Sequence, residues 1–141
     1  MEQIPFDGCF GCGPDNPCGL KATFRNMSDG GVEGFFTPHE HHCGYNDVVH
    51  VGPIAGFLSE VLGRLAFHRD LYYLTRSMNV TFKCSVSPGV RLHAMASLKK
   101  STSSHFSAEA SVYGPEGELI ATAEGHFITM KRAEAKKVVG K

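Results

Sequence analysis

Cysteine and histidine are the first residue types in this sequence whose spacing could support chemistry. The groups that could bind zinc together are Cys9, Cys12, Cys18, His39, His41, His42 and Cys43. A structural zinc site normally shows a second closely spaced pair of ligands, and no second pair follows Cys9 and Cys12. We therefore favour a glycine-rich cap with small, buried cysteines over a zinc site, and we expect no metal. No cysteine begins an expected helix, which disfavours a nucleophilic thiol.

A second candidate site begins at His50, where His50-Val51-Gly52-Pro53 leads into an expected helix. The first turn of a helix has unpaired backbone N–H groups and the positive end of the helix dipole, which can polarise a carbonyl oxygen. Glu60, two turns further on, could activate a water molecule as a general base. The alternative is that His50 is an ordinary loop histidine and Glu60 a solvated surface acid.

A third feature is a set of basic residues around the expected strands. They are Arg76, Lys83, Arg91, Lys99 and Lys100. Lys99 and Lys100 lead into a Ser-Thr-Ser-Ser loop that begins at Ser101, so charge, hydroxyls and N–H groups occur together there. This combination could bind a phosphate group. Solvated strand ends are the simpler interpretation.

The elements that would position these residues are six strands and one helix. Alternating apolar and polar residues predict strands over 20–25, 32–37, 74–83, 90–100, 105–113 and 119–130. From Pro53 to about His68 the apolar residues recur with helical spacing, and Gly56, Ser59 and Gly63 form a stripe of small residues on another face. The order β, β, α, β, β, β, β predicts an α+β fold with an antiparallel sheet and one long helix.

Composition is that of an ordinary globular domain, with 141 residues, 42% hydrophobic residues and 20% charged residues. Lys and Arg balance Asp and Glu at fourteen each, so net charge gives no reason to expect nucleic acid or an anionic membrane as a partner. No secretory signal is visible, and five cysteines is an odd number, so we expect reduced thiols in the cytoplasm. We expect one domain over 1–141, with a Gly/Cys-rich cap at 1–19 and a polar tail at 131–141.

Four motifs follow one another along the chain. They are Cys9-Phe10-Gly11-Cys12-Gly13-Pro14-Asp15-Asn16-Pro17 with Gly19-Leu20-Lys21, His50-x-Gly52 before Phe57-Leu58-Ser59-Glu60, the segment 75–89, and the segment 117–127. In this order they resemble hotdog-fold proteins of the PaaI-like acyl-CoA thioesterase group. The resemblance implies an antiparallel sheet wrapped around one long central helix. It also implies a homodimer or homotetramer, with the acyl-CoA site at the interface between two subunits.

The sequence departs from that family at two positions that matter for catalysis. The family's His-Gly-Gly pattern has Val51 at its first glycine, which keeps the backbone N–H and adds a side chain beside it. The resemblance places the family's acid nine residues after the histidine, where this chain has Ser59. A serine is not a general base at neutral pH, so Glu60 or Asp47 must substitute, or the protein binds acyl thioesters without hydrolysing them.

The sequence therefore predicts an acyl-CoA thioesterase that uses no metal or cofactor. The N–H of Val51, with that of Gly52, would hold the carbonyl oxygen, while His50 fixes the loop and Glu60 orients or deprotonates water. Further expected substrate contacts are Asn46, Gly56, Gly63, Thr75, Lys99, Lys100 and Ser101. The alternatives are a catalytically silent acyl-CoA binding protein and, more weakly, an acyl-CoA hydratase or dehydratase. The sequence establishes no His–acid pair for the last of these.

Overall fold

The computed structural model describes residues 7–131 and 133–134, so parts of the expected cap and most of the expected tail lie outside the described residues. The strands are β1 (Thr23–Asn26), β2 (Val32–Phe36), β3 (Tyr72–Phe82), β4 (Leu92–Ser101), β5 (His105–Tyr113) and β6 (Leu119–Met130). The helix α1 (Val51–Phe67) follows β2, after a short 3-10 turn η1 (Glu40–His42). This order confirms the predicted α+β fold class.

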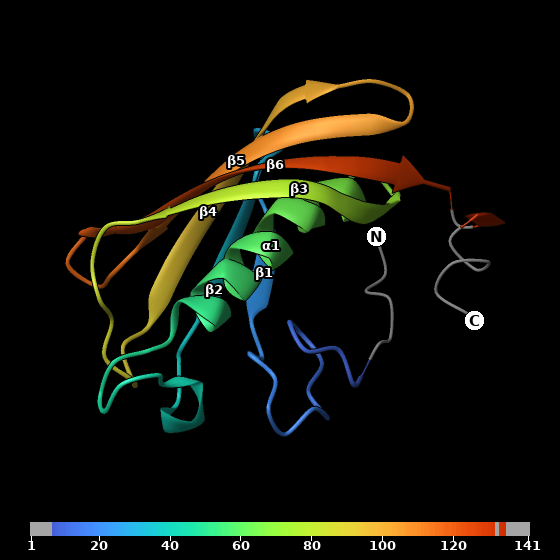
Figure 1. Cartoon of the computed structure of the whole chain (residues 1–141). Helices are drawn as coiled ribbons and strands as arrows, with labels where there is room; N and C mark the ends of the chain where they lie inside the picture. The colour runs from blue at the N-terminus through green and yellow to red at the C-terminus, as the bar shows by residue number, and fades with distance from the viewer. Residues whose placement is uncertain (1–6, 132, 135–141) are drawn as a thin grey trace.

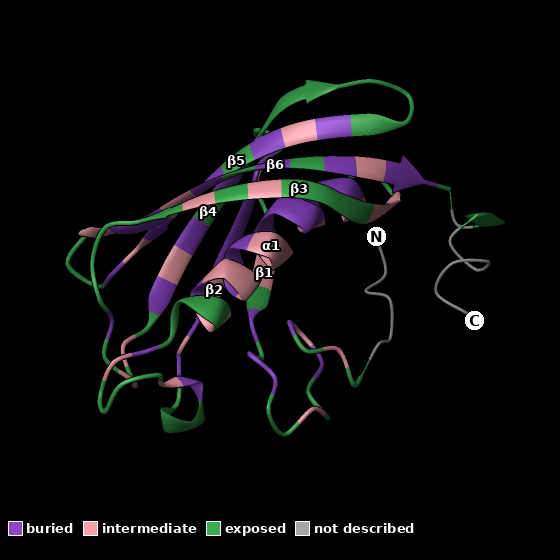
Figure 2. Cartoon of the chain, viewed as in Figure 1, coloured by how far each residue is buried: buried purple, intermediate pink, exposed green. Residues whose placement is uncertain are grey.

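The strands form one antiparallel sheet in the order β1-β2-β4-β5-β6-β3, and α1 lies along its concave face (Figure 1). The apolar side of α1 explains this packing, because Phe57, Leu58, Val61 and Leu62 are fully buried against the strands. Burying one such side chain stabilises the fold by about 1.5–3 kcal/mol. Figure 2 shows that the buried residues of α1 lie on the side of the helix that meets the sheet.

The first expected strand begins three residues later than its alternating pattern predicts. Lys21 has a φ of 53°, which is a left-handed conformation that interrupts an extended chain. The N–H groups of Leu20 and Ala22 donate instead to the carbonyls of Phe10 and Gly11, at 2.7 and 3.0 Å. Leu20 and Ala22 are therefore buried as part of the N-terminal cap, which we define as residues 7–22.

The edge strand β3 has an exposed backbone along one side. It is eleven residues long and hydrogen-bonds to β6 alone among the described strands. Two of its large apolar side chains remain accessible, with Leu74 41% and Phe82 40% exposed. A long edge strand with accessible apolar residues is a surface that another strand can extend.

Candidate functional site

The N-terminus of α1 offers one backbone N–H that nothing else in the described residues binds. The helix begins at Val51, two residues before Pro53, and His50 is its N-cap. The N–H of His50 donates to the carbonyl of His42 at 2.9 Å, and the N–H of Gly52 donates to Nδ1 of His50 at 2.8 Å. Pro53 has no N–H. Val51 is thus the residue whose N–H is free to bind a ligand oxygen at the positive end of the helix dipole.

His50 caps the first turn of α1. Its Nδ1 accepts a hydrogen bond, so the proton of the neutral ring lies on Nε2, and the side chain is exposed. A side chain at Gly44 would meet the His50 ring at 3.1 Å, so the loop before α1 packs closely against that ring. The expectation that Gly52 helps to bind the carbonyl is not supported, because its N–H is already used by His50.

A hollow of about 320 Å³ lies directly beside Val51, and we call it the Val51 hollow. It is lined by Val48, Val49, Val51, Ile54, Phe82, Lys83, Cys84 and Ser85. Its walls are largely apolar, and Lys83 adds a positive charge. The sequence singled out Lys83 only as one of several basic residues, and it gave no signal for Phe82 or Cys84. Phe82 is the last residue of β3 and Lys83 and Cys84 follow it, and the fold brings all three beside the start of α1.

Glu60 lies under the N-terminal cap. The Sγ of Cys9 donates to Oε1 of Glu60 at 3.8 Å, and an added Cβ at Gly11 would come within 2.1 Å of the Glu60 carboxyl carbon. Burial raises the pKa of the Glu60 carboxyl, while Arg64 and the Cys9 thiol act in the opposite direction. Gly56, four residues earlier, faces the same cap at Leu20 and Phe10.

Ser59 lies on a different side of α1, toward β3. The Cβ position of Gly63 is within 2.0 Å of the Tyr73 ring, so the stripe that contains Ser59 and Gly63 faces the edge strand. The four residues from Gly63 back to Ser59 cover about 6 Å along the helix, and the two residues from Tyr73 forward to Thr75 cover about the same length along β3. Ser59 and Thr75 therefore lie at the same level, each with a hydroxyl group.

The small residues that the sequence predicts as one stripe contact two different parts of the chain. Gly56 packs on the cap and Gly63 on the chain's own Tyr73, so neither lines the Val51 hollow. The glycine at 63 is explained by packing, because Tyr73 occupies the space that a side chain would need.

The remaining predicted contacts lie away from the Val51 hollow. Asn46 and Asp47 are exposed at the tip of a tight loop, where Asp47 has a φ of 61°. The Nζ of Lys99 binds Glu124 at 2.8 Å, and the hydroxyl of Ser101 accepts from Arg69 at 3.1 Å. Lys99, Lys100 and Ser101 belong to β4, which β5 and β6 separate from β3. Within one chain these residues do not meet Val51.

No protein-family model matches this sequence, and no curated protein sequence matches it. Solved structures do match. The PaaI protein of the E. coli phenylacetic acid degradation operon aligns with a TM-score of 0.73 at 13% identity, over 79% of this chain and 80% of that one. A hypothetical thioesterase from Streptococcus pneumoniae with coenzyme A aligns with a TM-score of 0.72 at 13% identity, over 78% and 86%. The chain has the hotdog fold.

A third matching structure contains a bound ligand. A Streptococcus mutans protein bound to acetyl-CoA aligns with a TM-score of 0.72 at 13% identity, over 78% of this chain and 89% of that one. At these identities the likeness establishes the hotdog fold of this chain, and its chemistry must be argued from its own residues.

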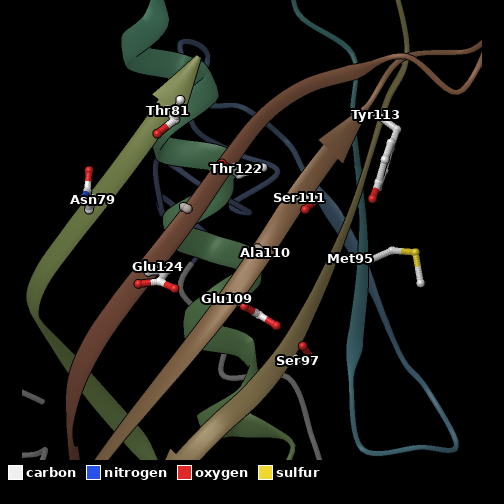
Figure 3. A pocket seen from close by; sticks show the side chains of 11 residues that line it. Asn79, Thr81, Met95, Ser97, Glu109, Ala110, Ser111, Tyr113, Thr122 and Glu124 are labelled. Atoms are coloured by element: carbon white, nitrogen blue, oxygen red, sulfur yellow. The ribbon is translucent and has the colours of Figure 1, made fainter. Parts of the chain in front are cut away.

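The outer face of the hotdog sheet carries a larger groove of about 540 Å³ (Figure 3). Its lining residues come from β3, β4, β5 and β6, and most of their side chains lie on the face away from α1, whereas Ala110 and Ala123 belong to the core. Glu109 and Glu124 stand directly opposite each other there, and Lys99 neutralises only part of this charge. Two carboxylates repel the phosphate groups of a nucleotide, so we assign the candidate site to the Val51 hollow instead.

Within residues 7–131 and 133–134, no three His, Cys, Asp or Glu side chains are placed to hold a metal ion. Over the same residues, no helix combines the length and the apolar character that a membrane span requires. The cap cysteines are also less buried than expected, since Cys9 and Cys12 are half-buried and Cys18 is exposed.

His42 makes the loop before α1 sensitive to pH. Its Nδ1 accepts from the N–H of His39 at 2.9 Å, and burial followed by the neighbouring His41 lowers its pKa. A lowered pKa in the folded state means that the unfolded state binds the proton more tightly, so stability falls as pH drops below about 6.5. We expect the loss of unfolding free energy between pH 7.5 and 5.5, measured in urea, to be smaller in His42→Gln. An equal loss in both proteins would contradict this role.

Proposed function

We propose that this protein hydrolyses acyl-CoA thioesters, with the thioester carbonyl held by the backbone N–H of Val51. The observation that carries the proposal is the free Val51 N–H at the start of α1, beside an apolar hollow with one lysine. The N–H and the helix dipole stabilise the negative charge that develops on the carbonyl oxygen. The apolar wall suits the acyl chain, and Lys83 suits an anionic part of CoA.

The chemical step needs only water and the thioester. Water adds to the carbonyl carbon and loses a proton, while the carbonyl oxygen becomes negative and is stabilised by the Val51 N–H. The C–S bond then breaks, and the departing CoA sulfur takes up a proton. The products are a carboxylic acid and the thiol of CoA. No cofactor is required, because no group changes oxidation state.

The residue at the family's acid position comes from a second copy of the chain. Ser59 lies eight residues after Val51, which is about 12 Å along the same helix and too far to serve the same carbonyl. Pairing of two β3 edges would bring the partner's helix alongside, running in the opposite direction. Phe82 lies beside Val51 at one end of β3, and Thr75 lies level with Ser59 nearer the other end. A two-fold axis near the middle of β3 would therefore place the hydroxyl groups of Ser59 and Thr75 beside the Val51 hollow of the partner subunit.

Binding without turnover is the second candidate, and the position of Glu60 favours it. The cap residues Cys9 and Gly11 lie against the Glu60 carboxylate, which argues against Glu60 as the base that deprotonates water. The side of α1 toward β3 carries Ser59, which can hold a water molecule and is not a base at neutral pH. Turnover then depends on carbonyl polarisation alone and is slow.

A panel of acyl-CoA esters, aliphatic and aromatic, assayed for release of free CoA thiol tests the proposed function. Release from one or more esters above the spontaneous rate supports hydrolysis. Saturable binding of the same esters without release supports the second candidate. An absence of both binding and release across the panel would overturn both.

The dimer provides a separate prediction about mass. We expect sedimentation equilibrium to give twice the 15.3 kDa chain mass or a multiple of it. Leu74→Lys places a charge on the edge strand, which should shift the protein toward monomer and lower thiol release. Leu98→Lys is the matched control, because Leu98 is similarly exposed at 37% on β4, away from that edge. A wild-type monomer with full activity would contradict the two-subunit site.

A further inference from the structure

The N-terminal cap contains two thiols that the proposed hydrolysis does not use. Cys9 and Cys12 lie in one tight turn, closed by a hydrogen bond from the N–H of Gly13 to the carbonyl of Cys9 at 2.9 Å. Residues three apart in such a turn have Cβ atoms about 5–6 Å apart, and a disulfide needs about 3.5–4.5 Å. The Cys9 side chain also contributes to the raised pKa of Cys12, so the two thiols are close neighbours. A small adjustment of the turn is enough to join them.

We propose that Cys9 and Cys12 form a dithiol–disulfide pair coupled to the carboxylate of Glu60, with a low-molecular-weight disulfide of the glutathione type as the oxidant. The coupling has a direct structural basis. The Sγ of Cys9 donates to Oε1 of Glu60 at 3.8 Å, and the backbone of Gly11, between the two cysteines, lies against the same carboxylate. The pair would react in this way whether or not the protein hydrolyses acyl-CoA thioesters.

The surroundings of the pair assign different roles to the two thiols. Burial, followed by the nearby Glu60 charge, raises the pKa of Cys12 to about 11, so Cys12 is a protonated thiol at neutral pH. It needs a base before it can attack a disulfide. Glu60 has a raised pKa from burial and lies beside the cysteines, so its carboxylate is placed to accept that proton.

The exchange balances in two steps. Cys9 passes its thiol proton to Glu60 and attacks one sulfur of the glutathione disulfide as the thiolate, which forms a mixed disulfide and releases one glutathione thiolate that takes up this proton. Cys12 then attacks the Cys9 sulfur, passes its proton to Glu60 and releases the second glutathione. The protein loses two electrons in total, and the oxidant is reduced to two thiols.

Oxidation removes a hydrogen bond from a buried charge. The disulfide has no S–H, so Glu60 loses the donor that now stabilises its carboxylate. The contact between the cap and α1 therefore weakens, and the cap should open more often. The oxidised protein should have a lower Tm and roughly tenfold faster amide exchange over residues 7–22.

The test uses the full chain with Cys18→Ser and Cys84→Ser, which removes the two exposed cysteines. After treatment with glutathione disulfide, peptide mass analysis should show Cys9 linked to Cys12 and a loss of two hydrogen atoms. Hydrogen exchange and Tm are then compared in the reduced and oxidised states. Cys9→Ser is the matched control, because its hydroxyl can still donate to Glu60 but forms no disulfide, so its Tm should not respond to the oxidant.

Glu60→Gln distinguishes the effect of losing the Cys9–Glu60 hydrogen bond from any effect of the disulfide bond alone. In this variant the pair should oxidise more slowly, and oxidation should no longer change the exchange of the cap. Cys12→Ala provides a second variant without a disulfide if Cys9→Ser does not fold. The proposal is overturned if glutathione disulfide gives no Cys9–Cys12 bond. It is also overturned if the bond forms but leaves Tm and cap exchange unchanged, or if Glu60→Gln responds like the parent protein.

Discussion

Replacing Ser59 with Asp will raise the rate of thioester hydrolysis by about a hundredfold to ten-thousandfold, the range that general-base catalysis usually contributes. Ser59 lies on the side of α1 that faces β3, level with Thr75, where the partner's Val51 hollow is expected. A carboxylate there can take a proton from the attacking water, which a serine hydroxyl does not do at neutral pH. The rate constant for release of free thiol from one good acyl-CoA ester is the measurement.

Two control variants test whether the effect comes from the new carboxylate at position 59, from its shape alone, or from the neighbouring Glu60. Ser59→Asn has nearly the same size as Asp without the charge and should not raise the rate. Glu60→Gln should change the cap and leave the rate nearly as it was. If Glu60 were the base instead, Glu60→Gln would lower the rate by the same range. Ser59→Asp would then be neutral or harmful, because adjacent carboxylates raise the cost of ionising both.

Replacing Val51 with Pro will lower kcat/KM by about a hundredfold to a thousandfold, the usual effect of losing one donor to a developing oxyanion. Proline removes the N–H and is otherwise suited to the first position of a helix. His50 already has φ −62° and ψ 148°, the conformation that a residue before proline adopts. The helix should therefore form as before.

Val51→Ala is the matched control for the proline variant, because it removes the same exposed side chain and keeps the N–H. Val51 is 48% exposed, so little packing is lost in either variant. Circular dichroism and Tm should show that both variants fold. Equal activity in Val51→Pro and Val51→Ala would exclude the Val51 N–H from the reaction.

Most of the fold could be predicted from the sequence because its apolar periodicities are long and regular. The strands over residues 105–113 and 119–130 have the predicted bounds, and the helix differs only at its first turn. The first strand begins late because Lys21 takes a left-handed conformation, which a run of alternating residues does not indicate. Helix geometry alone also separates Ser59 from Glu60 by about 100°.

The candidate site was less predictable, since it depends on contacts between distant segments. The pattern of small residues could not show that Gly56 meets the cap while Gly63 meets Tyr73. Nor could it show that the cap covers Glu60, because fifty-one residues separate Cys9 from Glu60. Phe82, Lys83 and Cys84 approach Val51 only because α1 runs antiparallel to β3. Local patterns specify the elements, and the packing of those elements decides which side chains meet.

Infrared difference spectroscopy measures directly whether the Val51 N–H polarises a bound thioester carbonyl. A carbonyl-labelled acyl-CoA ester that the panel shows to bind is compared in complex with Val51→Ala and with Val51→Pro. We expect the carbonyl stretch to shift to lower frequency in the Val51→Ala complex, because a hydrogen bond weakens the C=O bond, and we expect no such shift in the Val51→Pro complex. The same carbonyl frequency in the two saturated complexes would contradict this expectation.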